Sequence, residues 1–153
     1  MVVLLNDLVF SYRHDLWRMT MNPAEYPVLN DQGVLNEVTA MSDRYEKALG
    51  ENALLELDAL FYNGAETVRY GVGENLYGFD EIQAFRRNRT GGSPPREVLR
   101  RVVTAIGKDV ATVDLEFQRI GSDRIGRQSQ TWFRSPEGWK IIAAHVSLMG
   151  TIS

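Results

Sequence analysis

Arg69 is the side chain in this sequence whose surroundings most directly suggest chemistry. It lies in the short run ETVRY, immediately before the glycine-rich segment GVGENLYG. Because side chains alternate along a strand, Arg69 lies on the opposite face from Val68 and Tyr70. If those two residues pack in the core, Arg69 points outwards and forms a surface ion pair, which the residues alone favour. If the strand curls around a cavity instead, the guanidinium group enters it and can hold a carboxylate through two hydrogen bonds.

Tyr45 is the second candidate, because it is a phenol on the apolar stripe of an expected helix. The stripe recurs at helical spacing and consists of Val34, Val38, Met41, Tyr45 and Leu49. A buried phenol needs a partner for its hydroxyl group. If the partner is a backbone carbonyl, Tyr45 is a core residue. If the hydroxyl reaches a pocket, it can donate or relay a proton, and a nearby Arg69 cation would favour the phenolate.

Four polar or aromatic side chains are expected to share one face of the C-terminal hairpin. With SPEG as a four-residue loop, Arg134 lies opposite Trp139, and the same face then carries Gln128, Gln130, Trp132 and His145. Two amides, an indole and an imidazole suit a pocket for a polar, planar, urea-like molecule, so we predict that they bind substrate. A dimer interface would suit them equally. A slip of one residue would put Ser129 and Thr131 on this face instead.

Several kinds of site do not fit the residues that the chain contains. The chain has no cysteine, and its two histidines, His14 and His145, lack metal-binding spacing, so we predict no metal site. GVGENLYG lacks the spacing and the lysine of a phosphate loop, and no G-x-S-x-G motif provides a nucleophilic serine. The net charge of −3 argues against nucleic acid as a partner. The basic run from Arg86 to Arg89 is expected to face a helix end and solvent, or to draw anionic substrates to a cavity mouth.

The order of helical and alternating patterns predicts the fold that positions these residues. Helices are expected from a cap at Asn30 or Asp31 to Gly50, from Asn52 to Phe61 and after the cap Asp80, with ETVRY as a short strand before the third. After the turn TGGSPP come four β-type runs: REVLRRVVTAIG, DVATVDLEFQRI, GRQSQTWFR and WKIIAAHVSLM. The sequence therefore predicts an α+β fold with N-terminal helices packed in a strongly curved, mainly antiparallel sheet.

The chain has 153 residues, which is enough for one domain, and we place that domain at residues 31–149. Residues 1–30 are predicted to be an N-terminal extension that is either mobile or a packing arm with a stripe from Leu4 to Leu16. It has the features of neither a signal peptide nor a membrane span, so no membrane partner is expected. The run IIAAHVSLM is apolar on both faces. One face therefore needs a cover, and a homodimer through the sheet is the simplest one.

Four segments carry a resemblance to a known family: RYEKAL, TVRYGVGENLYGFDEIQAFR, RIGRQSQTWFR and GWKIIAAHVSLM. They resemble the AtzH and HpxZ proteins, a branch of the nuclear-transport-factor-type (SnoaL-like, cystatin-like) superfamily. The resemblance covers about Asp31 to Met149. It implies a cystatin-like cone with a pocket between the sheet and the long helix, in a small cytoplasmic dimer without metal or cofactor. Proteins of this branch are associated with the catabolism of cyanuric acid, oxalurate and related nitrogen compounds.

The resemblance favours an enzyme that performs a decarboxylating amidase-type step on a carboxylated urea or ureido acid, such as a dicarboxyurea-like or oxalurate-like molecule. It also favours Arg69 inside the cavity. In this hypothesis the substrate is a small anion, Arg69 anchors its carboxylate, and Tyr45 supplies or relays a proton as a carbon–nitrogen bond breaks. The alternative is a non-catalytic accessory protein that binds a ligand or a neighbouring amidase of the same pathway.

Overall fold

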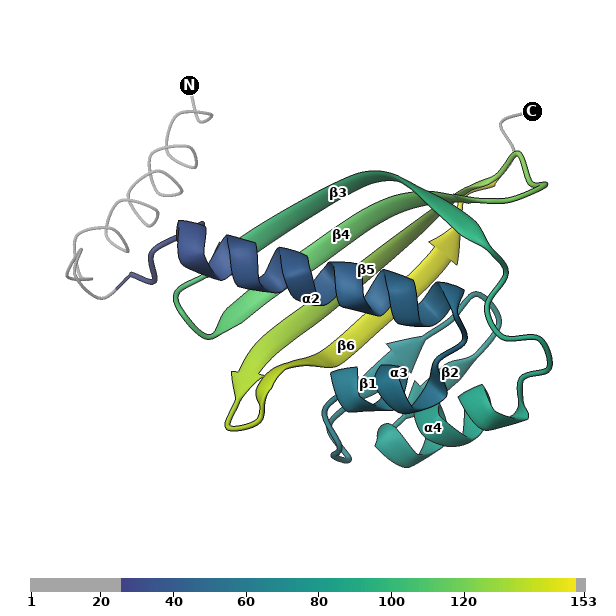
Figure 1. Ribbon diagram of the computed structural model, residues 1–153, viewed down its shortest axis with the longest axis horizontal. Helices are drawn as coiled ribbons and strands as arrows, with labels where there is room; N and C mark the ends of the chain where they lie inside the picture. The colour runs from purple at the N-terminus through teal and green to yellow at the C-terminus, as the bar shows by residue number, and fades with distance from the viewer. Residues whose placement is uncertain (1–25, 151–153) are drawn as a thin grey trace, which may run out of the picture.

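The computed structural model describes residues 26–150 and contains a long helix that lies across a curved, six-stranded sheet (Figure 1). Its helices are α2 (Gln32–Gly50), α3 (Leu54–Leu60) and α4 (Phe79–Asn88). Its strands are β1 (Val68–Tyr70), β2 (Asn75–Tyr77), β3 (Arg96–Ile106), β4 (Val110–Arg119), β5 (Ile125–Ser135) and β6 (Gly138–Leu148). This arrangement confirms the predicted α+β fold.

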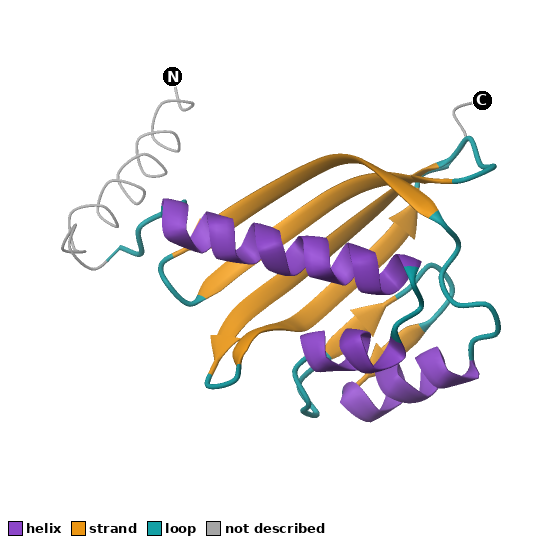
Figure 2. Ribbon diagram, in the orientation of Figure 1, coloured by secondary structure: helices purple, strands orange, loops and turns teal. Residues whose placement is uncertain are grey.

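The strands follow the order β2-β1-β6-β5-β4-β3 across the sheet. β1 runs parallel to β6, and every other neighbouring pair is antiparallel, so the sheet is mainly antiparallel as predicted. Figure 2 shows α2 along the four long strands, with α3 and α4 beside the end of the sheet that carries β1 and β2. The helices therefore cover one face, called the inner face here. The opposite, outer face carries no described helix.

α2 begins where the sequence predicts and is held by its apolar stripe. Asp31 is the N-cap, and its carboxylate accepts a hydrogen bond from the Val34 amide at 3.2 Å. Val34, Val38 and Tyr45 are buried against the sheet. Full burial of one aliphatic side chain contributes about 1.5–3 kcal/mol, which exceeds the differences in helix propensity among ordinary residues. Packing on the sheet therefore decides the position of α2.

The next two helices differ from the predictions at their first residues. The sequence predicts Asn52 as the cap of α3, but Ala53 is the N-cap and Asn52 adopts a left-handed φ of 51° in the turn before it. The cap of α4 is Gly78 instead of Asp80, and its φ of 80° is a conformation that glycine adopts without strain. Asp80 lies in the first turn of α4, where a carboxylate interacts favourably with the helix dipole.

A buried ion pair joins α3 to α4. The Asp58 carboxylate accepts hydrogen bonds from Arg86 Nη1 at 2.9 Å and from Gln83 Nε2 at 2.8 Å. The Arg86 guanidinium group also lies over the ring of Phe61, 4.3 Å from its centre. Burial lowers the pKa of Arg86, and the attraction of Tyr45 and Asp58 opposes this change. This ion pair holds α4 against α3 on the inner face of the sheet.

A β-bulge in β6 changes the predicted pairing of the C-terminal hairpin. Trp132 lies opposite Ile141, as the four-residue loop predicts, but Thr131 lies opposite Ala143. Ile142 is therefore an extra residue on β6. Beyond it, the alternation of side chains between the two faces is reversed.

The bulge moves His145 away from its predicted neighbours. His145 lies opposite Ser129 and is exposed on the outer face, where its ring is 5.8 Å from that of Tyr70. The prediction that His145 shares a face with the other three residues of its set is wrong for this reason. Those three do share the inner face, and they are Gln128, Gln130 and Trp132.

The segment just before α2 forms backbone hydrogen bonds with the end of β3. The Asn30 amide donates a hydrogen bond to Ala105, and the Gly107 amide donates one to Val28, both at 2.9 Å. The predicted stripe from Leu4 to Leu16 lies outside the described residues. Within residues 26–150, the structure contains no helix with the length and apolar character needed to cross a membrane.

Candidate functional site

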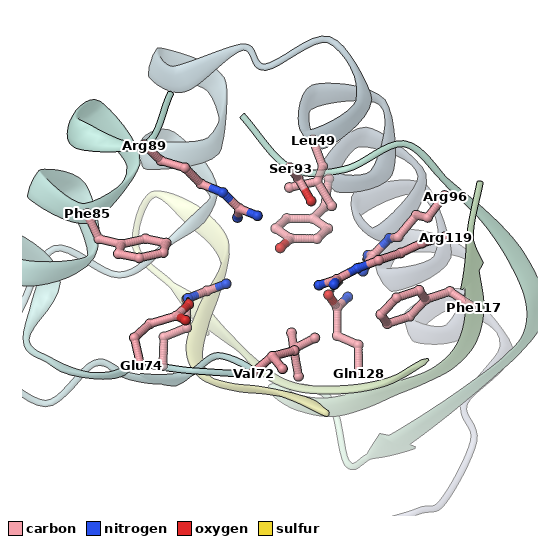
Figure 3. A pocket seen from close by; sticks show the side chains of 13 residues that line it. Leu49, Val72, Glu74, Phe85, Arg89, Ser93, Arg96, Phe117, Arg119 and Gln128 are labelled. Atoms are coloured by element: carbon pink, nitrogen blue, oxygen red, sulfur yellow. Dashed lines mark hydrogen bonds and ion pairs between the residues drawn. The ribbon is translucent and has the colours of Figure 1, made fainter. Parts of the chain in front are cut away.

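A cavity of about 430 Å³ lies between the C-terminal half of α2, α4 and the inner face of the sheet. Figure 3 shows side chains from several elements arranged around it. Its polar and aromatic lining residues are Tyr45, Arg69, Glu74, Phe85, Arg89, Ser93, Arg96, Phe117, Arg119 and Gln128. Three of the six predicted site residues are among them, namely Tyr45, Arg69 and Gln128.

Arg69 enters the cavity and forms an ion pair there. Its strand, β1, lies near the curled edge of the sheet, so the inner face of β1 lines the cavity. Arg69 Nη1 donates a hydrogen bond to Glu74 Oε1 at 2.6 Å. The guanidinium group also lies 5.4 Å from the centre of the Phe85 ring. The two alternatives from the sequence, an ion pair and a cavity, therefore occur together.

Tyr45 reaches the cavity from α2. The residue is 4% exposed, and its ring lies 6.4 Å from that of Phe61. Within residues 26–150 its hydroxyl group makes no hydrogen bond, so the backbone partner considered from the sequence does not occur in the described part of the chain. The hydroxyl is left for a ligand or water.

Arg96 is held in place from three sides. Its Nε and Nη2 donate to the two carboxylate oxygens of Glu46 on α2, at 3.1 and 2.6 Å. Nη2 also donates to Gln128 Oε1 at 3.0 Å, and the guanidinium group lies over the ring of Phe117 at 4.3 Å. A bidentate pair of this kind fixes an arginine strongly. Arg96 therefore fixes the Gln128 amide at the cavity wall.

Arg89 and Arg119 add two further cations to the lining. Neither forms an ion pair with a residue in the range 26–150. Burial lowers the pKa of Arg119, and repulsion by the guanidinium groups of Arg89, Arg96 and Arg124 lowers it further. In Figure 3, Arg89 lies across the cavity from Arg119. Two cavity cations, Arg89 and Arg119, that have no carboxylate partner among the described residues indicate a site for an anion.

The remaining predicted site residues lie elsewhere. Gln130 and Trp132 are buried between the sheet and the helices and do not line the cavity; Trp132 Nε1 donates to Gln130 Oε1 at 3.2 Å. His145 is on the outer face. Within the described residues, no three His, Asp or Glu side chains are grouped as a metal ion would require.

Sequence reasoning did not name four charged residues of the cavity as site residues: Glu74, Arg89, Arg96 and Arg119. Arg89 belongs to the basic run after Phe85, for which a role near an anionic substrate was one alternative. Arg96 and Arg119 lie opposite each other on β3 and β4, a relationship that exists only once these strands pair.

Comparisons with known proteins agree with this fold and extend over almost all of the described chain. The family model described as AtzH-like matches residues 27–152. The crystal structure of a protein of unknown function from Pectobacterium atrosepticum is 51% identical, with a TM-score of 0.78, over 85% of this chain and 99% of that one. A cystatin-like fold protein from Burkholderia xenovorans is 43% identical, with a TM-score of 0.78, over 82% of this chain and 98% of that one.

A more distant structure shares the fold alone. A nuclear transport factor 2-like protein of unknown function from Pseudomonas putida is 15% identical, with a TM-score of 0.67, over 80% of this chain and 98% of that one. No curated protein matches the sequence.

Proposed function

Because the chain belongs to the AtzH-like family, we propose that it is a small cytoplasmic enzyme of nitrogen-compound catabolism that acts on a carboxylated urea or ureido acid. The reaction is a decarboxylating amidase-type step, and the protein performs it without a metal or cofactor. One observation carries the proposal: a phenol without a hydrogen-bond partner in residues 26–150 lines a cavity together with four guanidinium groups.

The charges of the cavity support an anionic substrate. The guanidinium groups belong to Arg69, Arg89, Arg96 and Arg119, and two carboxylates compensate them, Glu74 at Arg69 and Glu46 at Arg96. Four positive and two negative charges leave an excess of two positive charges. A substrate with two carboxylates, one near Arg69 and one near Arg119, would neutralise this excess in surroundings where burial strengthens each charge interaction.

The proposed reaction needs a proton donor near the nitrogen atom. When an N-carboxylated urea loses its carboxylate as CO₂, the carbon–nitrogen bond breaks, its electron pair stays on nitrogen, and the nitrogen takes up a proton. The Tyr45 hydroxyl supplies or relays this proton, and water returns it. The buried Arg86 guanidinium group attracts the negative charge that forms on the Tyr45 oxygen during this transfer. Arg69 holds the carboxylate and orients the substrate.

The experiment that tests the proposal is a turnover assay of the purified protein without any amidase. The substrates are a panel of carboxylated ureas and oxalurate, and the readout is release of CO₂ together with loss of substrate. Turnover of one panel member above the uncatalysed rate is the expected result. His145→Ala is a matched control, because the structure places this predicted site residue on the outer face, and it should leave turnover unchanged.

An accessory protein that binds an amidase of the same pathway is the second candidate. It is favoured by two exposed rings, that of Tyr70, which lies next to His145 on the outer face, and that of Tyr77, which lies next to Tyr70. Under this alternative the assay above shows no turnover with any substrate. Mixing this protein with the purified amidase would then change the turnover rate or the stability of the amidase, compared with the amidase by itself.

A further inference from the structure

The Glu74 side chain occupies the position on Arg69 where an external carboxylate would bind. Its Oε1 accepts the bond from Arg69 Nη1 at 2.6 Å, and its Oε2 accepts a longer bond from the Gly73 amide at 3.3 Å. Both charged side chains line the cavity, and they are 14% and 25% exposed. A carboxylate held between a guanidinium group and a backbone N–H is a common arrangement for a bound anion.

Gly71 leaves the space that this carboxylate fills. A Cβ atom at Gly71 would overlap the Glu74 carboxylate. The φ angle of Gly71 is not in the left-handed region, so the backbone conformation would allow other residues there. Glycine is required because a Cβ atom would have no space. Gly73, in the same turn, differs, because a Cβ atom there would have no other described heavy atom within 4 Å.

The turn that carries Glu74 lies at the edge of the sheet and outside the hydrophobic core. It joins β1 to the edge strand β2, each only three residues long, and Val72 at its tip is 49% exposed. Glu74 also opposes the lowering of the Arg119 pKa, so its negative charge matters across the cavity. If the Glu74 side chain leaves the cavity, a negatively charged ligand can take the place of its charge.

We propose that Arg69 Nη1, the Gly73 amide and the bare Cα of Gly71 form a carboxylate subsite that Glu74 fills in the ligand-free protein. A carboxylate of the ligand replaces Glu74 there, and the Glu74 side chain moves outwards with its turn. This inference rests on the proposed function in that it takes the ligand to be a carboxylated molecule in this cavity. Competition by Glu74 weakens the apparent affinity by the fraction of molecules in which the subsite is free.

Glutarate is a suitable probe, because it is an unreactive dicarboxylate with the same chain length as a dicarboxylated urea. Its dissociation constant is measured by titration calorimetry with the full chain. Glu74→Gln removes the competing charge and should tighten glutarate binding by about tenfold. Gly71→Ala fills the subsite with a methyl group and should weaken binding by about tenfold, although it also displaces Glu74.

Two controls match these variants. Gly150→Ala makes the same chemical change outside the cavity lining, at a position where a Cβ atom meets no described heavy atom within 4 Å, so the affinity should stay within about twofold of that of the wild type. Glu97→Gln removes one negative charge from an exposed position on β3 and shows how much of the effect comes from net charge alone. Melting temperatures confirm that each variant is folded.

The outcomes separate this inference from the proposed function. Weaker glutarate binding by Glu74→Gln means that Glu74 orients Arg69 instead of occupying a ligand position, and it overturns the inference. Unchanged binding by a folded Gly71→Ala, or no binding by both wild type and Glu74→Gln, overturns it as well. Tighter glutarate binding by Glu74→Gln and weaker binding by Gly71→Ala, without turnover of any carboxylated urea, would support the subsite and contradict the proposed reaction.

Discussion

At Arg69, an ion pair and a position inside the cavity are compatible because the partner carboxylate also lies inside the cavity. The sequence offered the two as alternatives, since a surface ion pair is the usual fate of an arginine in a short strand. β1 lies next to the edge strand of a curved sheet, so its inner face is neither core nor bulk solvent. An arginine there keeps its charge, gains Glu74 as a counter-ion and stays accessible to a small ligand.

Arg69→Met should abolish most of the activity while the fold survives. Methionine keeps much of the apolar stem but has no donor for a carboxylate. The loss of one charged hydrogen-bonded contact costs about 2–5 kcal/mol, which lowers kcat/KM by about 30-fold or more. Glu74 loses its partner but is partly exposed, so it can be solvated. Steady-state kinetics and a melting curve measure the two effects. A large drop in melting temperature with unchanged turnover per folded molecule would identify Arg69 as a structural residue.

Tyr45→Phe should lower kcat without lowering the melting temperature. The substitution removes a hydroxyl group that makes no hydrogen bond within the described residues, so no buried partner is left unsatisfied. Loss of a proton donor in general acid catalysis typically costs about 10²–10⁴-fold in rate. The expected result is therefore a fall in kcat of this order with little change in KM. If the variant had the same kcat as the wild type, Tyr45 would not be the proton donor of the reaction.

Helical spacing placed Tyr45 on the face of α2 that meets the sheet, and the hairpin pairing placed Gln128 on the predicted pocket face. For Arg69 the residues alone favoured a surface ion pair, and the family resemblance favoured the cavity. Arg96 and Arg119 were not identified. Their roles depend on the pairing of β3 with β4 and on the Glu46 carboxylate of α2, which are contacts between residues far apart in the sequence. Charge repulsion among these arginines is a property of the assembled cavity alone.

At the scale of elements, helix order and strand alternation were sufficient to predict the architecture, but not the register of the last hairpin. The turn fixes the first pairs correctly, as Trp132 and Ile141 show. The bulge at Ile142 then shifts all later pairs, and no residue type at Ile142 or Ala143 signals it. A bulge is favoured where a sheet must bend, so its position follows from tertiary curvature that local sequence does not encode.

The ion pair between α3 and α4 predicts a stability effect. Asp58→Asn removes the charge that pairs with Arg86, and both side chains are only about a tenth exposed, at 10% and 11%. Leaving a buried cation without its partner typically costs about 3–5 kcal/mol, and the amide recovers part of this as a hydrogen-bond acceptor. We therefore expect urea denaturation to show a loss of about 2–3 kcal/mol in the free energy of unfolding. Asp123→Asn, in an exposed loop, is the control and should change it by less than about 0.5 kcal/mol.

Glu37 predicts a contribution to stability that is lost in acid. Its carboxylate accepts hydrogen bonds from Trp139 Nε1 and from Arg134, and these bonds lower the pKa of Glu37 below its ordinary value of 4.5. Because the folded-state pKa is the lower one, the contribution is present above pH 4.5 and disappears as the pH falls through the lowered value. Glu37→Gln should therefore destabilise the protein at neutral pH, and the difference from wild type should shrink below pH 4.5. Urea denaturation across this range measures it; a difference independent of pH would assign the effect to packing.

At the scale of the whole molecule, the two faces of the sheet differ in what covers them. The inner face packs against α2, α3 and α4, whereas no helix of residues 26–150 covers the outer face. Register places Thr112, Thr131 and Ala143 side by side across the middle of the outer face. These side chains are small, and the rings of Tyr70 and His145 lie on the same face. A face with small side chains at its middle suits close approach of an identical face across a two-fold axis.

We therefore expect a homodimer through the outer face. Light scattering in dilute solution should give about twice the chain mass of 17.3 kDa. Thr131→Arg puts a long, charged side chain in the middle of the face, and in an isologous interface the same charge on the other copy opposes it. This variant should therefore be monomeric, with its inner face intact and its glutarate affinity retained. A wild-type monomer would contradict the dimer and point to the N-terminal extension or another protein as the partner of this face.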